Sequence, residues 1–546
     1  MDQQRNLVLA FALSMVILLG WSVLFPNPEK KHGEQQTAAV SQSTGTQKQG
    51  TAGPGLNPPA GAPAQQATSA PAQPKAEPSP LLSDKAAFSL SNDVLTLTLN
   101  DKGWIIGAAL NKYRENLDPG SPHVSVLYLS AHKEQAAYAY SGVRDGTRYV
   151  EASPFRLLKQ GNAPEQSSLT LQSTLSDGRT WVRTLTLHKD SYVVDVEDRI
   201  QGGSATQMFT QVVERSPDKK ASRFAQHAGP IALVGDKLHE IKYETLDKDG
   251  PQQMESKGGW AGMMTHYFIA SIIGGENHDN HFYFKGNGQS YQAGLIYGGK
   301  AEKGTTVFET RLFLGPKSMP VLKQLDVGLE RSVDFGWFAF IAKPLHSLLV
   351  WLHGFIPNYG LCIIVLVLMI KALFFYPTKK SYESMAGMRK LQPEMTRLKE
   401  LYGDDRQKMG QEMMALYKKH KVNPMGGCLP IVIQIPVFFS LYKVLLMSIE
   451  MRQAPFFGWI HDLSAQDPYY VLPVLMGISM FVQQKLNPQP ADAMQAKVMQ
   501  FLPLIFTTMF LFFPSGLVIY WVVNNVLSII QQYYVMRSQG VLSVSR

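Results

Sequence analysis

An apolar run from Leu361 to Tyr376 carries a single charged residue, Lys371, and this combination constrains the chain more than any other feature. Such a run is typical of a segment that crosses a bilayer. A lysine at mid-membrane costs roughly 2.5–3.5 kcal/mol on insertion scales, so these residues usually face a protein interior or a water-filled cavity. A second interpretation stays open, because Pro377 follows closely and the side chain could reach the headgroups. The rest of the sequence has to separate the two.

The composition indicates a multi-domain membrane protein. The chain has 546 residues, of which 45% are apolar and 17% charged, so it is too long for one domain and less charged than a typical soluble protein. The net charge of +9 does not indicate nucleic-acid binding, because most of the excess lies in one loop beside apolar spans. The two cysteines, Cys362 and Cys428, lie in or beside such spans, so no disulfide framework is predicted.

The N-terminal region predicts an anchor and a tether. The apolar run Leu7 to Phe25 is close to the length that spans hydrocarbon and is preceded by Arg5. A cleavable signal peptide would have a shorter apolar core, so we favour an uncleaved transmembrane anchor over residues 1–26 with a cytoplasmic N-terminus. Residues 27–82 contain few large apolar side chains and are predicted to form a flexible periplasmic linker.

Residues 83–318 predict a large all-β domain. Leu95, Leu97 and Leu99 alternate with threonines, and a turn signal at residues 100–103 follows. Further short strands, such as Ser168 to Leu175, are separated by similar signals. Many short strands joined by turns favour a β-sandwich, which the anchor would place in the periplasm.

The last part of the chain predicts an α-helical polytopic membrane core. Residues 319–355 read as a connection followed by an amphipathic helix lying in the membrane interface. A core over residues 356–536 then contains candidate spans, and a short tail occupies 537–546. The spans are Ile356 to Tyr376, Leu429 to Ile449, Tyr469 to Leu486, Val498 to Phe513 and Ser515 to Met536.

The loop from Pro377 to Cys428 sets the orientation, because it is short enough for the positive-inside rule and rich in lysine and arginine. The loop is therefore predicted to be cytoplasmic. Counting the anchor, this predicts six transmembrane helices, cytoplasmic N- and C-termini and a periplasmic β-domain.

Apolar residues recur within this loop at three- and four-residue spacing, which predicts a cytoplasmic helical hairpin over residues 378–424. Two interpretations remain open. The seam packs the two helices together, or its methionines offer an adaptable surface for apolar segments of other chains. The methionines are Met385, Met388, Met395, Met409 and Met413.

Polar residues also recur within the spans. Some follow helical spacing in the last span and so share one face. Such residues commonly bond helix to helix, but together with Lys371 they would also line a hydrated indentation. The candidates are Gln434, Ser440, Thr507, Thr508, Trp521, Asn524 and Ser528.

Signatures of enzymes, metals and cofactors are poor. The stretch Gly294 to Lys300 has the spacing of a phosphate loop, but Ala301 stands where a hydroxyl would hold magnesium, so we treat the match as chance. The histidines of the β-domain lack metal-ligand spacing. The sequence therefore predicts neither an enzyme nor a bound metal or cofactor.

Several motifs of the C-terminal half resemble the YidC/Oxa/Alb family of membrane protein insertases in its Gram-negative form. The resemblance implies a five-span core around a hydrophilic groove that is open to cytoplasm and lipid and closed toward the exterior. It also implies an additional N-terminal anchor and a periplasmic β-sandwich. The motifs are Asn423-Pro-Met-Gly-Gly-Cys-Leu-Pro430, Gln434-Ile-Pro436, Arg452-Gln-Ala-Pro-Phe456, Trp459-Ile-His-Asp-Leu-Ser464, Asp467-Pro-Tyr-Tyr470 and Phe513-Pro-Ser-Gly-Leu517.

The resemblance also assigns residues. Lys371 takes the position of the groove's positive charge, which is usually arginine; lysine keeps the charge but lacks the bidentate guanidinium. Gln434 matches a groove-lining position. Tyr520 and Trp521 match aromatic positions that meet a substrate helix.

The implied function is insertion and folding of inner-membrane proteins, alone or with the Sec translocon, without a nucleotide or other cofactor. Implied partners are nascent membrane proteins, the bilayer, Sec components, and the ribosome or signal recognition particle through cytoplasmic loops, with no direct nucleic-acid binding. Two other classes remain open. One is a small-solute transporter, although no internal repeats are evident; the other is an anchored periplasmic carbohydrate-binding protein, which rests on fold analogy alone.

Overall fold

The computed structural model describes residues 85–129, 135–203, 207–217, 227–276, 278–403, 405–423, 426, 429–488 and 493–541. The predicted anchor at 1–26 and linker at 27–82 lie outside these residues. The described residues contain strands and one short helix up to residue 316, and helices thereafter.

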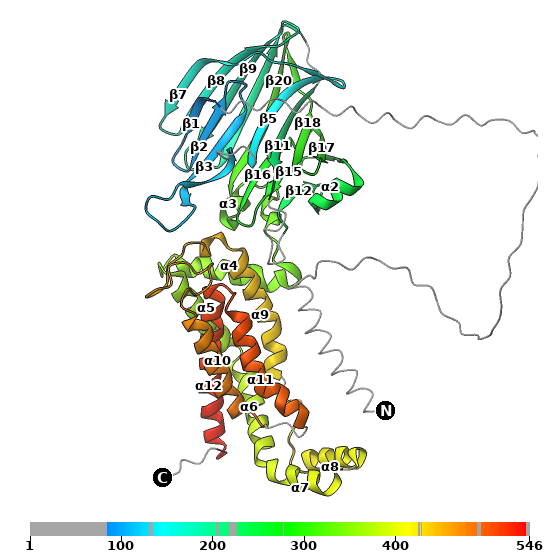
Figure 1. Cartoon of the computed structure of the whole chain (residues 1–546), viewed down its shortest axis with the longest axis vertical. Coiled ribbons are helices and arrows are strands. Elements are labelled where there is room, and N and C mark those ends of the chain that lie inside the picture. Colours follow the sequence, from blue (N-terminus) through cyan, green and yellow to red (C-terminus); the bar gives the residue numbers. More distant parts are fainter. Residues whose placement is uncertain are drawn as a thin grey trace, which may run out of the picture. The chain divides into compact units, whose positions relative to one another are not determined.

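The strands form two antiparallel sheets, each ten-stranded over the described residues, that make a β-sandwich (Figure 1). Strands β11 and β18 of the first sheet pack against β15 and β16 of the second. The first sheet contains β1 (Ala86–Ser91), β2 (Leu95–Asn100), β3 (Ile105–Arg114), β4 (His123–Leu129), β5 (Ala136–Asp145), β6 (Arg148–Val150), β11 (Gln207–Arg215), β14 (Gln252–Lys257), β17 (Asp279–Gly286) and β18 (Ser290–Tyr297). The second contains β7 (Arg156–Ala163), β8 (Gln166–Thr174), β9 (Thr180–His188), β10 (Val193–Gln201), β12 (Gly229–Val234), β13 (Lys237–Glu240), β15 (Trp260–Met264), β16 (Phe268–Ile273), β19 (Lys300–Glu302) and β20 (Thr305–Pro316). A short helix, α2 (Tyr243–Asp249), lies between β13 and β14.

Alternating side chains explain why these segments become half-buried strands. Leu95, Leu97 and Leu99 of β2 are fully buried, while the threonines between them are partly exposed. The predicted turn follows, with the Gly103 amide donating to the Asn100 carbonyl oxygen at 3.0 Å. Gly103 adopts φ +69°, a conformation that glycine accepts without strain.

The stretch with phosphate-loop spacing belongs to strands of two different sheets. Residues 294–297 belong to β18, and residues 300 and 301 begin β19. No helix follows, so its amides do not form an anion cradle at a helix start. The interpretation of this motif as a chance match agrees with the structure.

A buried lysine lies directly after the last strand of the β-domain. Lys317 follows β20 and is only 1% exposed; its ammonium group donates to the Thr265 carbonyl oxygen at 3.4 Å. Burial lowers the pKa of Lys317 from 10.5 to about 7, against the opposing effect of Glu240 and Asp334. The folded protein therefore disfavours the charged form of this side chain.

This lysine predicts a specific pH dependence. Between pH 7 and 10.5 the unfolded chain binds more protons at Lys317 than the folded one, so its contribution to the free energy of unfolding rises with pH across that window. Below pH 7 the penalty is fully present. We expect Lys317→Met to raise the free energy of unfolding at pH 6 by roughly 1–4 kcal/mol and to flatten the slope above pH 7. Urea unfolding of the full chain at pH 6, 8 and 9.5 measures both, and an unchanged slope would contradict the assignment.

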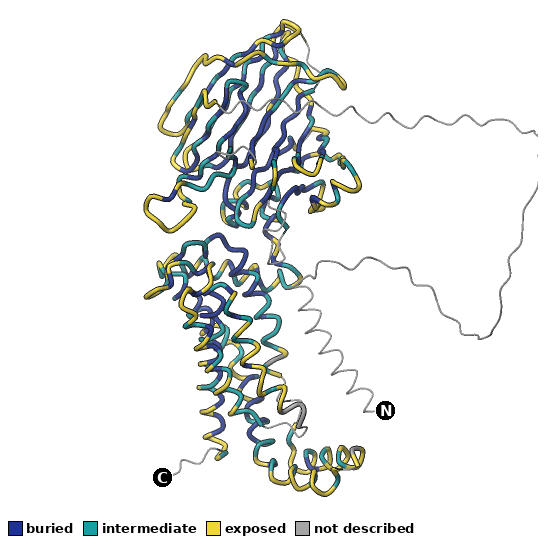
Figure 2. The backbone as a smooth tube through the Cα atoms, viewed as in Figure 1, coloured by how far each residue is buried: buried dark blue, intermediate teal, exposed yellow. Residues whose placement is uncertain are grey.

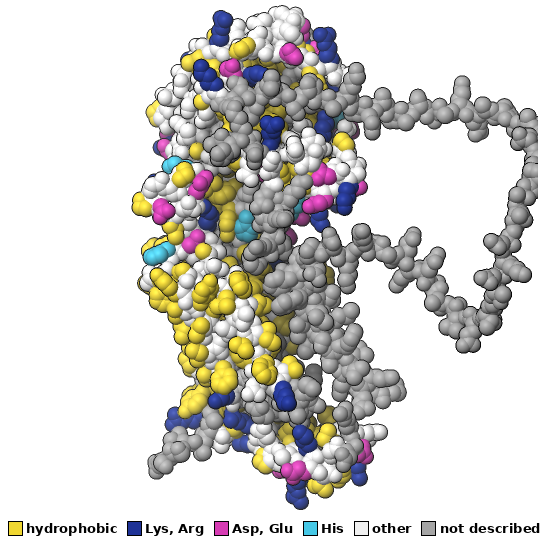
Figure 3. All heavy atoms as spheres, in the orientation of Figure 1, with side chains coloured by type: hydrophobic (Ala, Val, Ile, Leu, Met, Phe, Trp, Pro, Cys, Tyr) yellow, Lys and Arg dark blue, Asp and Glu magenta, His cyan; other side chains and the backbone are white. Residues whose placement is uncertain are grey.

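The helical part contains α3 to α12 among the described residues, and most residues of α7 and α8 are exposed (Figure 2). Its apolar side chains form a band, and lysine and arginine gather beyond one end of that band (Figure 3). The helices are α3 (Met319–Gln324), α4 (Ala339–His353), α5 (Tyr359–Leu373), α6 (Phe375–Lys390), α7 (Gln392–Tyr402), α8 (Arg406–Lys419), α9 (Leu429–Met447), α10 (Val471–Leu486), α11 (Ala493–Phe510) and α12 (Ser515–Ser538).

The predicted interfacial segment and spans coincide with helices, although their ends differ. Helix α4 covers most of the predicted amphipathic segment and leaves Trp351 exposed. The predicted span at 498–513 corresponds to α11, which begins earlier and ends at Phe510. Among the described residues, no single helix is both long and apolar enough to cross a membrane, whereas the α5–α6 pair, bent by 68°, passes on length and composition. The predicted number of spans therefore stays a prediction.

Candidate functional site

Lys371 lies in the last turn of α5 and points toward α12. Its ammonium nitrogen donates to the Ser528 hydroxyl oxygen at 2.7 Å, and that hydroxyl in turn donates to the Asn524 carbonyl oxygen at 2.7 Å. Ser528 is buried, with 4% exposure. The lysine is therefore directed to the polar face of a neighbouring helix and does not extend past the end of its own helix.

The charge of Lys371 is not neutralised by the part of the chain that the structure describes, where no carboxylate pairs with it. An ammonium group has three N–H donors, and Ser528 accepts one of them. Lys371 is partly buried, and a cation in such surroundings is stabilised when its remaining donors are satisfied. Water or a carboxylate of another chain can fill this role, and the position near the C-terminal end of α5 adds a modest favourable dipole.

A second polar contact joins α9 to α12. The Gln434 amide donates to the Tyr520 hydroxyl oxygen, and Tyr520 is 1% exposed. One residue further, Trp521 packs edge-on against Phe438, with ring centroids 4.7 Å apart, and also against Phe510. The Trp521 indole N–H is buried without a partner in the structure. Gln434 and Tyr520 are thus hydrogen-bonded to each other, whereas the indole N–H of Trp521 has no acceptor among the residues that the structure describes.

The other predicted groove residues divide into two groups. Asn524 is 9% exposed and belongs to the α12 face that Lys371 meets. Ser440, Thr507 and Thr508 each donate to a carbonyl oxygen four residues earlier in their own helix. Thr508 is exposed, and the structure does not bring it to Lys371.

The sequence interpretation missed some members of this network. Tyr382 of α6 is buried and packs with Val535 of α12, so α6 contacts the same helix as Lys371 of α5. Three residues before Ser528 on α12, Asn525 donates to Ser479 of α10 at 3.0 Å. Tyr382 is separated from Lys371 by three helical turns of sequence, a spacing that would have placed the two on one side of a continuous helix.

The methionines of the predicted hairpin have separate surroundings. Met385 is buried with Tyr382 and Val535, and Met388 packs against this cluster, so both contact α12. Met395 of α7 accepts from the Tyr417 hydroxyl of α8 at 3.7 Å. Met409 and Met413 of α8 are partly buried. Packing accounts for Met385, Met388 and Met395 in this conformation.

Comparison with known proteins now decides the family. A model described as the 60Kd inner membrane protein matches residues 351–541, and one described as the YidC periplasmic domain matches residues 87–348. A membrane protein insertase YidC of Cupriavidus metallidurans is 40% identical over 560 residues, covering 99% of this chain and 98% of the relative. The chain belongs to the YidC family of membrane protein insertases.

A further relative agrees with this assignment. The YidC of Methylococcus capsulatus is 47% identical over 401 residues, covering 71% of this chain and 72% of its own. A crystal structure of an active YidC insertase with its first transmembrane domain resolved covers 83% of this chain and 93% of its own at 17% identity, with a TM-score of 0.39.

Family membership establishes the general activity. The protein is a membrane protein insertase of the inner membrane with a periplasmic β-sandwich domain and a helical C-terminal region. Its YidC relatives are named as insertases rather than enzymes. Among the described residues, no group of histidine, cysteine and carboxylate side chains is arranged to hold a metal ion.

Proposed function

We propose that this insertase receives the hydrophilic flank of a new membrane protein at the polar face of α12, beside Lys371. The observation that carries the proposal is the Lys371 ammonium group, which is bonded to Ser528 and has no carboxylate partner in the described part of the chain. An acidic flank supplies the missing carboxylate. The apolar segment of the substrate then leaves along the lipid-exposed sides of the helices.

The energetics require no nucleotide. Burial of the substrate's apolar span supplies the main driving force. A membrane potential adds about 2.3 kcal/mol per charge per 100 mV, and it favours outward transfer of negative flanks. A hydrated polar face inside the helices shortens the hydrocarbon path that such a flank must cross. Lys371 lowers the cost of the acidic flank at the position where that cost is greatest.

The proposed topology follows the charge pattern. Exposed basic residues on α7 and α8, such as Arg397 and Lys418, support a cytoplasmic hairpin. This orientation gives six spans including the segment at 7–25, cytoplasmic termini and a periplasmic β-domain. It also leaves the hairpin accessible to a ribosome or signal recognition particle. Work beside the Sec translocon is supported by family resemblance alone.

Photocrosslinking from the substrate tests the proposal. A benzoylphenylalanine placed in the acidic flank of a ribosome-bound single-span substrate is expected to label α9 and α12 around Gln434 and Asn524. The same probe in the substrate's apolar segment is expected to label exposed residues of α10 and α11, such as Val474 and Ile505. Mass spectrometry of the crosslinked peptides distinguishes the two. Labelling of α10 and α11 by the flank probe would show that the flank bypasses Lys371.

A further inference from the structure

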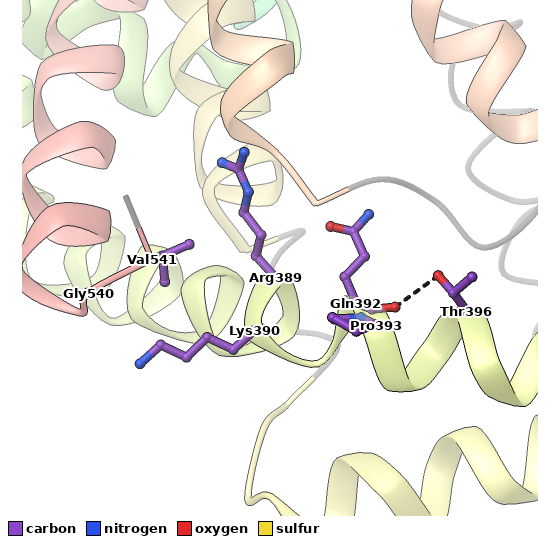
Figure 4. Close-up of a pocket in the computed structure, with 7 residues that line it drawn as sticks. All are labelled: Arg389, Lys390, Gln392, Pro393, Thr396, Gly540 and Val541. Atoms are coloured by element: carbon purple, nitrogen blue, oxygen red, sulfur yellow. Dashed lines mark hydrogen bonds between the residues drawn. The ribbon is translucent and has the colours of Figure 1, made fainter. Parts of the chain in front are cut away.

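The end of α6 carries a basic cavity that the insertion mechanism does not use. The cavity has a volume of about 600 Å³ and lies where α6 ends, α7 begins and the chain leaves α12. Its walls are formed by residues from the α6–α7 region and by the two residues that follow α12, which are Arg389, Lys390, Gln392, Pro393, Thr396, Gly540 and Val541. Figure 4 shows Arg389 and Gln392 extending to the same side of the α6–α7 turn, whereas Lys390 extends toward the side of Gly540.

The charge of this cavity is not compensated from within. In the portion of the chain that the structure describes, neither Arg389 nor Lys390 pairs with a carboxylate, and no acidic residue lines the walls. The nearest acidic residue in sequence, Glu394, lies with its carboxylate 3.7 Å from His420 of α8. The cavity therefore presents two cations and is suited to an anion.

Arg389 is held in place by the helices beside it. One terminal nitrogen donates to the Leu486 carbonyl oxygen at the end of α10 at 3.3 Å and lies 3.8 Å from the Met536 sulfur atom of α12. A guanidinium has five N–H donors in a fixed plane, so most of them remain available for a phosphate. Lys390 is exposed and supplies a mobile second charge.

The part of the wall that follows α12 is held by backbone bonds. The Gly540 amide donates to the Arg537 carbonyl oxygen, and the Val541 amide donates to the Met536 carbonyl oxygen, both at 3.0 Å. Gly540 has φ +67°, which turns the chain back over the end of α12. The wall therefore has a defined shape although it lies near the end of the chain.

Apolar surface adjoins the basic cavity along α12. Ile530, Tyr533 and Tyr534 are 59%, 47% and 70% exposed, and they lie one to three turns before Gly540 on the same helix. A soluble phosphate gains nothing from contact with this apolar surface, whereas an acyl chain buries apolar area against it. We propose that this cavity binds the phosphate of an anionic phospholipid headgroup, with the acyl chains lying along the exposed face of α12.

The proposed topology agrees with a lipid-binding site at this location. The proposed topology places the end of α6 at the cytoplasmic leaflet, where anionic lipids are available. Interfacial tyrosines commonly lie at headgroup level. The inference does not require Lys371, so its failure would leave the proposed insertion mechanism untouched.

Lipid titration of the full chain tests the site. Delipidated protein is titrated with phosphatidylglycerol or phosphatidylcholine, and bound lipid is counted by native mass spectrometry. We expect phosphatidylglycerol to bind at least tenfold more tightly than phosphatidylcholine. We also expect the double variant R389Q/K390Q to weaken phosphatidylglycerol binding about tenfold. The matched control R397Q/K399Q removes the same charge from exposed positions of α7 outside the cavity and is expected to change binding less than twofold.

Further arms separate the alternatives. Because Arg389 also bonds to α10, Lys390→Glu alone serves as a variant that leaves this contact intact, and it should still weaken phosphatidylglycerol binding at an unchanged melting temperature. Glycerophosphoglycerol, the soluble headgroup, is expected not to displace the lipid at equal concentration. Equal effects of the two double variants, displacement by the soluble headgroup, or an RNA oligonucleotide that binds more tightly than the lipid and depends on Arg389 and Lys390 would each overturn the proposal.

Discussion

Lys371→Glu is expected to lower insertion of a single-span substrate with an acidic flank at least tenfold. A tenfold change corresponds to about 1.4 kcal/mol, whereas two unit charges 4 Å apart interact by about 4 kcal/mol at an effective dielectric constant of 20. Replacing attraction with repulsion at the α12 face therefore exceeds what a tenfold loss requires. Lys371→Arg keeps the charge and is expected to retain most of the activity. Reconstituted proteoliposomes and a protease-protection assay give the measurement.

Two controls make this result specific. Lys485→Glu produces the same change of charge at an exposed position of α10, beside Phe481, and is expected to leave insertion within twofold of the original. Insertion of a substrate with an uncharged flank should differ little between the Lys371 variants. If both substrates fail equally with Lys371→Glu, or if neither responds, the lysine does not act through the flank's charge.

Asp198→Ala is expected to destabilise the β-domain by about 3–5 kcal/mol. The Asp198 carboxylate is fully buried and accepts bonds from Arg183, at 2.7 and 3.0 Å, and from the Trp181 indole N–H at 2.6 Å. Removing it leaves the Arg183 guanidinium, itself 3% exposed, without its counter-charge in a low-dielectric interior. Urea unfolding of the full chain, monitored by the protease resistance of the β-domain, measures the loss of stability.

An exposed pair provides the comparison for Asp198. Asp195 lies on the same strand, 3.1 Å from His188, and both side chains are about half exposed. Asp195→Ala should cost less than about 1 kcal/mol, because solvent screens the pair. The double change of Asp198 and Arg183 to leucine and methionine should recover part of the stability. Similar losses for Asp195→Ala and Asp198→Ala would show that burial of the ion pair does not set its importance.

The β-domain could be predicted because the sequence patterns that specify its strands and turns are local. Leucines that alternate with threonines specify a buried and an exposed face, and a short turn signal specifies where the strand ends. The structure places both as predicted at Leu95 to Gly103. The pairing of strands distant in sequence, such as β5 with β11, is absent from any local pattern and could not be predicted in this way.

The residue types of the candidate site could be predicted from the sequence, but the directions in which their side chains point could not. Lys371 had two open interpretations, because a lysine near a helix end can turn outward or inward. The contact with Ser528, 157 residues away, decides the direction in the structure, and only tertiary packing can bring the two together. Thr507 and Thr508 show the same limit, since one helical step separates a partly buried side chain from an exposed one.

The bend at Phe374 has a mechanical consequence. Helix α6 leaves α5 at 68° three residues after Lys371, and Tyr382 on α6 packs with Val535 of α12, the helix whose Ser528 accepts from that lysine. A pivot of about 10° at the bend would sweep the far end of a 24 Å helix by about 4 Å. Such a movement of α6 would change the packing of Tyr382 against α12, two turns from the Ser528 hydroxyl that accepts from Lys371.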